Sequence, residues 1–176
     1  IGIALGADYT KAGKNVDIVL LKDYNAPNTD YHDNLAQCQA TITVDLNGNT
    51  FYADRSLFRL TPKANSVTTN VILKNGNVVL GNNPLVTLYS YTYPEKLFTF
   101  TCENVNISVA DTSTLTSLIV GYNKKKDNNA NFELNFNDCV FDVRNAGNHI
   151  TLFEANDPTG TYPTPMTIKY SVEDCS

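Results

Sequence analysis

Apolar and polar residues alternate in short runs along most of the chain, and the same run recurs. Three segments align without gaps: Phe98–Asn104, Phe132–Asp138 and Ile168–Asp174. Each has three apolar residues at a spacing of two, which is the pattern of a strand with one buried face. Earlier copies are Thr41–Asn47 and Thr69–Asn75, each followed by glycine. The pattern predicts one strand that is repeated roughly every 30 residues.

A second alternating run follows each copy, and a third lies later in each period. The third series covers residues 56–61, 85–91, 117–122 and 149–154. Three strands that recur in this way place each strand beside its own copy in a parallel pair, and the chain winds as a coil. Parallel crossovers are right-handed by default. The expected fold is therefore all-β, a right-handed single-stranded parallel β-helix (a solenoid) of about four to five coils.

The chain divides into an entry region and the coils. Residues 1–40 are expected to form an N-terminal cap and entry strand, with a short helix in Ile1–Lys14, a strand in Val16–Lys22 and a loop-like stretch in Asp23–Asp33. Residues 41–176 are expected to form the coils, either as one structural domain or as part of a longer solenoid.

Each copy of the repeated strand ends at Asn or Asp, residues that tolerate the positive φ of a sharp corner. The series is Asn47, Asn75, Asn104, Asp138 and Asp174. Side chains stacked in this way would form a structural ladder, bonded along the stack as amides are in cross-β arrays. A calcium column is the functional alternative, but nothing else in the sequence supports calcium. No other cofactor or metal is predicted.

Two phrases in the repeats, Ile42–Asn49 and Val71–Asn77, are typical of one fold family. Over roughly residues 41–176 the chain resembles the right-handed parallel β-helix of the pectate-lyase-like superfamily. In that superfamily an asparagine ladder marks the tight turn between the second and third sheets, so the resemblance implies that the four later strands form the first sheet. The superfamily holds lyases, glycoside hydrolases, phage tailspikes and adhesins, so the fold does not determine the function.

The resembled enzymes hold substrate on the outer face of the first sheet. Alternation predicts that this face carries Leu57, Arg59, Thr87, Tyr89, Tyr91, Ser117, Ile119, Thr151 and Phe153. None is a carboxylate, whereas a glycoside hydrolase needs two carboxyl groups and a calcium-dependent lyase needs clustered acids with a base. Asp54, Asp111, Glu154 and Asp157 are expected at strand ends, where only loops could bring them together. The sequence therefore favours a protein without enzymatic activity.

A row of tyrosines is the best candidate for ligand binding. Tyr89, Tyr91 and Tyr93 share the outward face of one extended segment, at about 7 Å between successive rings. Such a row stacks sugar rings while the phenol hydroxyls bond the sugar hydroxyls. Arg59 on the neighbouring strand completes the candidate set. In the structural alternative these residues are ordinary strand formers on a solvated face, or a loop folds over them.

Two of the four cysteines occupy equivalent positions in successive repeats. Cys139 and Cys175 would stack about 4.8 Å apart across a parallel pair, which is within the range of a disulfide. A buried thiol stack is the other interpretation. Cys102 is expected in the core, and Cys38 has no predicted partner. The cysteines show no CxxC spacing, so no zinc site is predicted.

The composition of the chain limits the kinds of partner that it is expected to bind. The net charge of −5 disfavours nucleic acid and anionic membranes, and the most apolar window, Val16–Leu21, is too short to cross a bilayer. The 23 Asn residues and the low charged fraction of 18% indicate an extracellular or cell-surface protein. No capping helix follows the strand that ends at Cys175, so end-to-end self-association or a continuing chain is expected at this C-terminal edge.

These observations favour a non-catalytic extracellular β-helix module for carbohydrate binding, surface adhesion or assembly, with a glycan or another cell-surface polymer as partner. Two alternatives stay open. One is a polysaccharide lyase or glycoside hydrolase, or a fragment of one, that acts on the outer face of the first sheet. The other is a structural spacer or fibre subunit.

Overall fold

The computed structural model describes residues 15–26, 41–54, 56–60, 69–90, 97–123, 131–144, 149–156 and 167–176. Within these residues all regular structure is β, so the expected all-β class is confirmed. No helix long and apolar enough to span a membrane occurs in this part of the chain. The helix expected in Ile1–Lys14 and the candidates Cys38 and Asp157 lie outside the described residues.

Thirteen strands make up the described part of the chain. They are β1 (Val16–Val19), β2 (Tyr24–Ala26), β3 (Thr41–Asp45), β4 (Thr50–Ala53), β5 (Phe58–Leu60), β6 (Thr69–Leu80), β7 (Val86–Ser90), β8 (Leu97–Val109), β9 (Ser117–Asn123), β10 (Asn131–Asn137), β11 (Val140–Asp142), β12 (Thr151–Asn156) and β13 (Thr167–Glu173). β2 falls where a loop was expected, which is a correction to the predicted entry region.

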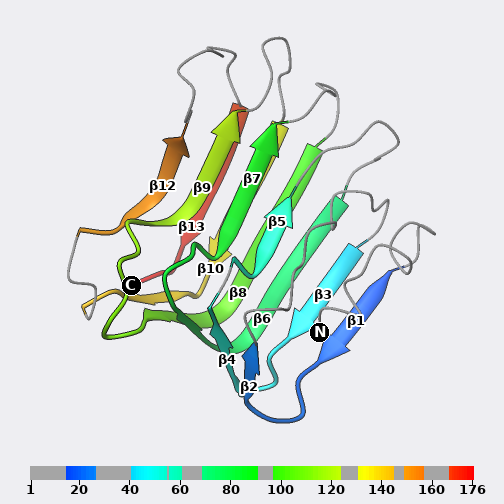
Figure 1. The fold of residues 1–176 in the computed structure, drawn as a ribbon. Coiled ribbons are helices and arrows are strands. Elements are labelled where there is room, and N and C mark those ends of the chain that lie inside the picture. Colours follow the sequence, from blue (N-terminus) through cyan, green and yellow to red (C-terminus); the bar gives the residue numbers. More distant parts are fainter. Residues whose placement is uncertain are drawn as a thin grey trace.

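The strands form two sheets that lie one in front of the other (Figure 1). The larger sheet has the order β1-β3-β6-β8-β10-β13, with β2, β4 and β11 pairing beside this path, and the smaller has the order β12-β9-β7-β5. Every pairing between described strands is parallel. We call the segments 15–26, 41–60, 69–90, 97–123, 131–156 and 167–176 repeats 1 to 6. Each pairing joins one repeat to the next, an arrangement that is compatible with a β-solenoid.

The register of the repeats agrees with the sequence alignment except where β3 leads into β4. We call the turn between these two strands, residues 46–49, the first corner. Phe98 lies opposite Phe132, and Phe132 opposite Ile168, as the alternation predicts. Thr41, however, lies opposite Asn70 rather than Thr69. The reason is a longer turn: four residues separate Asp45 from Thr50, but only two separate their partners Lys74 and Asn77. The strand of this earliest copy is therefore shifted by one residue relative to an alignment on the turn residues Asn47 and Asn75.

The core lies between the two sheets and is built from the inward-facing apolar residues of successive repeats. Phe58, Phe100, Phe136 and Phe141 form a chain of ring contacts with centroid separations of 5.5, 6.0 and 5.5 Å. The first three rings are almost completely buried. Offset and edge-on pairs of this kind add to the hydrophobic stabilisation from burial.

The predicted phase of the smaller sheet was wrong at three positions. Leu57 and Ile119 are buried, and Phe153 packs against the core, although all three were expected outward. Two consecutive residues face the core where the chain enters these strands, as Leu118 and Ile119 do, and this breaks the alternation. The outward position of β12 is therefore Glu154, whose Cα lies opposite that of Val120. The outer face of this sheet carries a carboxylate after all.

Candidate functional site

Repeats 2 to 6 each turn a corner of the larger sheet at a residue with a left-handed backbone. The residues are Asn47, Asn75, Asn104, Asp138 and Asp174, with φ between 51° and 59°. They are the five turn residues expected from the sequence, and no other described non-glycine residue has a positive φ. Asn and Asp adopt this conformation at the lowest cost among residues with a side chain, because a short polar group can bond locally.

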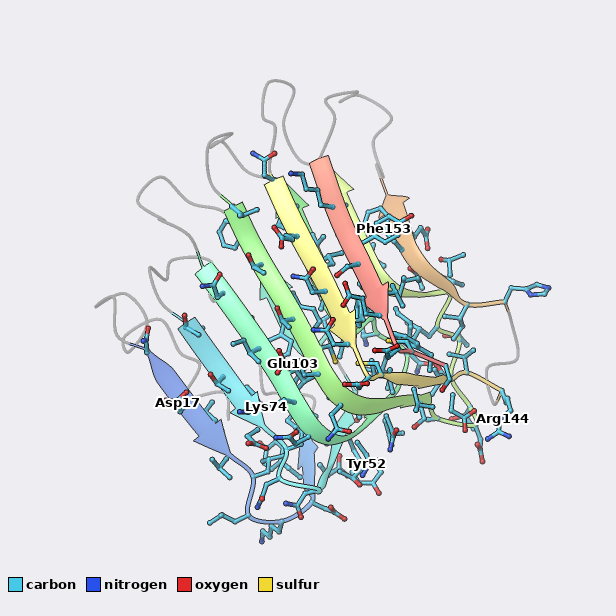
Figure 2. All side chains as sticks on the ribbon, turned by 180° about the vertical axis from the view of Figure 1, so that it is seen from behind. Asp17, Tyr52, Lys74, Glu103, Arg144 and Phe153 are labelled. Carbon is cyan, nitrogen blue, oxygen red and sulfur yellow. The ribbon has the colours of Figure 1, made fainter. Side chains whose placement is uncertain are left out.

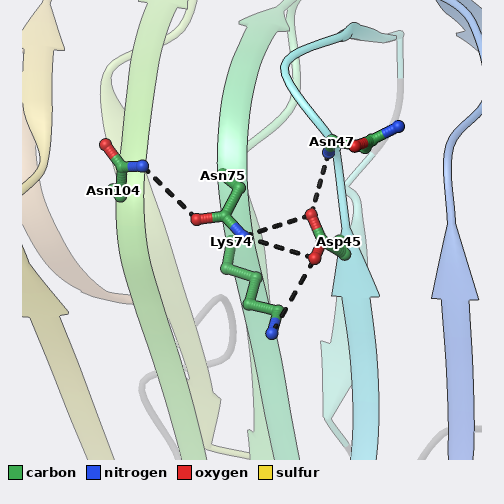
Figure 3. A network of polar contacts seen from close by, with 5 residues as sticks. All are labelled: Asp45, Asn47, Lys74, Asn75 and Asn104. Carbon is green, nitrogen blue, oxygen red and sulfur yellow. Dashed lines mark hydrogen bonds and ion pairs between the residues drawn. The ribbon is translucent and has the colours of Figure 1, made fainter.

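The side chains at this corner form a polar network (Figure 3). Asn104 donates from Nδ2 to Asn75 Oδ1 at 3.3 Å, and Asn75 donates to both carboxylate oxygens of Asp45 at 3.2 Å. Asp45 also accepts from the backbone N–H of Asn47 at 2.9 Å, and its Oδ2 lies 3.8 Å from Lys74 Nζ. The network therefore runs from Asn75 to Asp45 and not to the side chain of Asn47, because the first corner is longer.

The outer ends of the predicted ladder differ from its centre. Asn47 donates instead to the carbonyl of Leu20 at 3.2 Å. At the other end Asp138 replaces asparagine, and a carboxylate has no N–H to donate to the next side chain. Within the described residues, the amide-to-amide bond of this ladder joins Asn104 and Asn75 alone.

A second file of amides runs beside the ladder, and sequence reasoning missed it. Asn106 donates from Nδ2 to Asn77 Oδ1 at 3.0 Å, two residues beyond the turn positions Asn104 and Asn75. Asn49 follows Asn47 at the same spacing in the sequence, but the longer corner places Thr50, not Asn49, opposite Asn77. The sequence signal was an Asn-x-Asn spacing present in three successive repeats, at residues 47 and 49, 75 and 77, and 104 and 106.

The two files line a groove of about 440 Å³ on the surface of the corner. Its lining residues are Asp45, Asn47, Gly48, Asn75, Gly76, Asn77, Asn104 and Asn106. Asn104 and Asn106 are exposed. Within the described part of the chain, Asn77 Nδ2, Asn104 Oδ1 and Asn106 Oδ1 bond no other side chain or backbone group. The groove thus presents unused amide donors and acceptors to solvent.

The charge in the groove is small. Asp45 is the one carboxylate among the described lining residues, and it is shared between Lys74, Asn75 and the backbone of Asn47. No group of three His, Cys, Asp or Glu residues with metal-binding geometry occurs among the described residues. The chemistry that this surface offers is hydrogen bonding to an uncharged polar ligand.

The other predicted site residues are only partly described. Tyr91 and Tyr93 lie outside the described residues, so the tyrosine row stays a prediction. Tyr89 lies in β7 with its Cα opposite that of Tyr122 in β9, a tyrosine that sequence reasoning did not include. Arg59 lies in β5 opposite Thr87.

The candidate acids are spread over the fold. Asp54 directly follows β4, and Asp111 lies two residues after β8. Glu154 lies inside β12 in the other sheet and accepts a hydrogen bond from the hydroxyl of Thr116 at 3.3 Å. The expectation that Glu154 occupies a strand end was therefore wrong.

Three cysteines gather at the far end of the same corner, all as free thiols. The backbone N–H of Cys139 lies 3.3 Å from Cys175 Sγ, and Cys139 Sγ lies 3.4 Å from the carbonyl oxygen of Cys102. The hydrogen bond between the Cys102 and Cys139 side chains lowers the pKa of Cys139 to about 7 and raises that of Cys102 well above its ordinary value. Burial raises the pKa of Cys175.

The described residues thus define an all-β protein of stacked parallel strands with an amide-lined corner. A scan against models of known protein families gave no match, and searches of curated proteins and of solved structures also gave none. The site must therefore be interpreted from its own chemistry.

Proposed function

We propose that the chain is a right-handed single-stranded parallel β-helix of the pectate-lyase-like kind, with about four to five coils, and that it serves as a non-catalytic extracellular module that binds carbohydrate. The observation that carries this proposal is the groove beside Asn77, Asn104 and Asn106, where amide groups are left without a protein partner. The asparagine-rich, weakly charged composition supports the extracellular location.

Amides suit sugar hydroxyls because both kinds of group donate and accept hydrogen bonds. Asn104 Oδ1 and Asn106 Oδ1 can accept from neighbouring hydroxyls, and Asn77 Nδ2 can donate to a third oxygen. The groups come from adjacent repeats, which are about 4.8 Å apart in a parallel sheet. A polymer of repeating, uncharged sugars therefore fits this groove better than a phosphate or another strongly charged ligand.

The groove is better suited to binding than to hydrolysis. Glycoside hydrolysis uses two carboxyl groups on either side of the bond that breaks. Among the described lining residues the groove has Asp45 alone, and this carboxylate already has three partners. A module that holds a glycan without cleaving it needs only the hydrogen-bonding surface.

The chain itself supplies a conservative variant for the test. Asn106 lies opposite Val140 in the next repeat, so Asn106→Val removes the amide while keeping a residue that this strand position accommodates. The matched control is Asn135→Thr, because Asn135 lies outside the groove and opposite Thr101. Both variants should keep the parent circular dichroism spectrum.

The experiment screens the parent on an array of neutral and acidic polysaccharide fragments, and the best-bound fragment is then titrated calorimetrically. The lost hydrogen bond to Asn106 Oδ1 is worth about 1 kcal/mol, so Asn106→Val should weaken binding about fivefold while Asn135→Thr leaves it unchanged. A parent that binds no fragment, or an Asn106→Val variant that binds as the parent does, would refute the proposal. Loss of binding in Tyr91→Ala alone would move the site to the predicted tyrosine row.

A further inference from the structure

The edge of the larger sheet at β13 exposes apolar residues whose equivalents in repeats 2 to 5 are buried. Tyr170 is 72% exposed and Val172 is 45% exposed. Their partners one repeat earlier, Leu134 and Phe136, are at most 2% exposed. The inward-facing files therefore end in uncovered apolar side chains, and covering them removes apolar surface from water.

The backbone of β13 also has an open side. Among the described strands β13 pairs with β10 alone, and it is the last strand in the order of the sheet. An edge strand presents N–H and C=O groups that pair readily with another strand. An apolar face beside an open edge is an interaction surface for a further β-strand.

The sequence of β13 matches itself in the antiparallel direction. Residues 169–173 read Lys-Tyr-Ser-Val-Glu, which is symmetric in chemical type about Ser171. If two copies pair antiparallel with Ser171 opposite Ser171, each Lys169 lies opposite a Glu173, and each Tyr170 opposite a Val172. Opposite charges and aromatic–aliphatic pairs are both favourable cross-strand neighbours.

The symmetric arrangement also places the apolar residues of both copies on the same face of the joined sheet. Directly opposite residues of paired strands point to the same side of the sheet, so the apolar residues of the two copies meet over one core. A parallel pairing of the same two edges in register would instead place Lys169 opposite Lys169 and Glu173 opposite Glu173, which is unfavourable. A twofold pairing of this kind uses the same edge of both copies, so it gives a closed dimer and not a longer assembly.

We propose that β13 is a self-association surface, on which a second copy of this chain pairs antiparallel about a twofold axis at Ser171. This dimer does not depend on glycan binding, because the amide groove lies over repeats 2 to 4. The two proposals can therefore fail separately.

Analytical ultracentrifugation of the 176-residue chain over a wide range of concentrations tests the proposal. The parent should show an equilibrium between monomer and dimer that does not extend to larger species. A monomer at every concentration would overturn the proposal. Open-ended growth would also overturn it, because it would mean that β1 of the next copy occupies the edge.

Charge reversal tests the register. Glu173→Lys should weaken the dimer about tenfold, because it turns two attractive cross-strand pairs into repulsive ones. Its neighbour within the chain is the uncharged Asn137, so the fold should be retained. Lys169 lies opposite Glu133 within its own chain, so the rescue is made in a Glu133→Gln background, where residue 169 has no charged partner on β10. In that background Lys169→Glu should restore the affinity that Glu173→Lys loses, and failure to restore it would refute the register. The control on the interior strand β8 is Glu103→Gln, because Glu103 lies opposite Lys74 and a lysine there would face a like charge; this variant should dimerise as the parent does (Figure 2).

Discussion

Replacing Gly76 by alanine should be among the most damaging small substitutions in this fold. A Cβ at this position would lie 2.5 Å from Leu46 Cβ and 2.7 Å from the carbonyl oxygen of Asn49. Leu46 is completely buried and the second contact is to backbone, so neither neighbour can move away easily. The two extra residues of the first corner bring Leu46 and Asn49 over this glycine. The substitution therefore pushes the first corner away from the second.

The cost can be worked out from these contacts. Overpacking a close-packed interior by one carbon typically costs about 1–3 kcal/mol, and a clash with backbone falls at the upper end, about 3 kcal/mol. In a chain of this length 1 kcal/mol shifts the melting temperature by about 2–4 °C, so Gly76→Ala should lower it by about 6–12 °C. Thermal unfolding followed by circular dichroism measures the shift.

Gly48 provides the matched control. It has a positive φ of 76°, but a Cβ there would meet nothing within 4 Å. Gly48→Ala should therefore cost only the left-handed backbone penalty, about 1 kcal/mol, or about 2–4 °C. If Gly76→Ala melts within a degree or two of the parent, or if Gly48→Ala is the more damaging of the two, the packing described for this corner is wrong.

Three further predictions concern the core and the titrating groups. Phe100→Ala should cost about 3–5 kcal/mol in urea denaturation, because its buried ring contacts two others. Hydrogen bonds from the side chain and the backbone N–H of Arg144 hold the pKa of Asp142 at about 2. Arg144→Ala removes the guanidinium but keeps the N–H, so NMR titration should show the pKa of Asp142 raised part of the way towards 3.8. The effect of this exposed pair on stability, present at neutral pH and lost as the pH falls towards 2, should be too small to detect. The Cβ resonance of Cys139 should titrate near pH 7, and Cys102→Ala should raise that midpoint. Because the pKa of Cys139 is lowered from an ordinary value of 9.0, its contribution to stability should grow from pH 7 to 9, and unfolding midpoints that do not reflect this would contradict the assignment.

The repeated strands could be predicted because only one register places all their apolar residues on the buried face. Phe98, Phe132 and Ile168 recur with the same spacing to the turn residue, so a single register satisfies every apolar position at once. The smaller sheet was harder. Its strands begin with two consecutive inward residues, as at Leu118 and Ile119, and alternation counted through that point gives the opposite face.

The candidate groove was predicted only in part. The turn residues were visible because positive φ selects Asn, Asp and Gly. The second file at Asn77 and Asn106 has an ordinary extended backbone, and only the Asn-x-Asn spacing marks it. The role of Asp45 could not be predicted, because it depends on how many residues the first corner contains.

The change from asparagine to aspartate at the turn explains where the groove ends. Both residue types give the left-handed backbone that the corner needs, so Asp138 is as suitable for folding as Asn104. Only an amide, however, both donates and accepts, and hence only asparagine can pass a hydrogen bond from one repeat to the next. The lining residues come from repeats 2 to 4, where the turn residue is asparagine, and include none from the repeats where it is aspartate. The amides of repeats 2 to 4 therefore have a structural role, because they link neighbouring repeats by hydrogen bonds, and the groove that they line ends where aspartate interrupts those bonds.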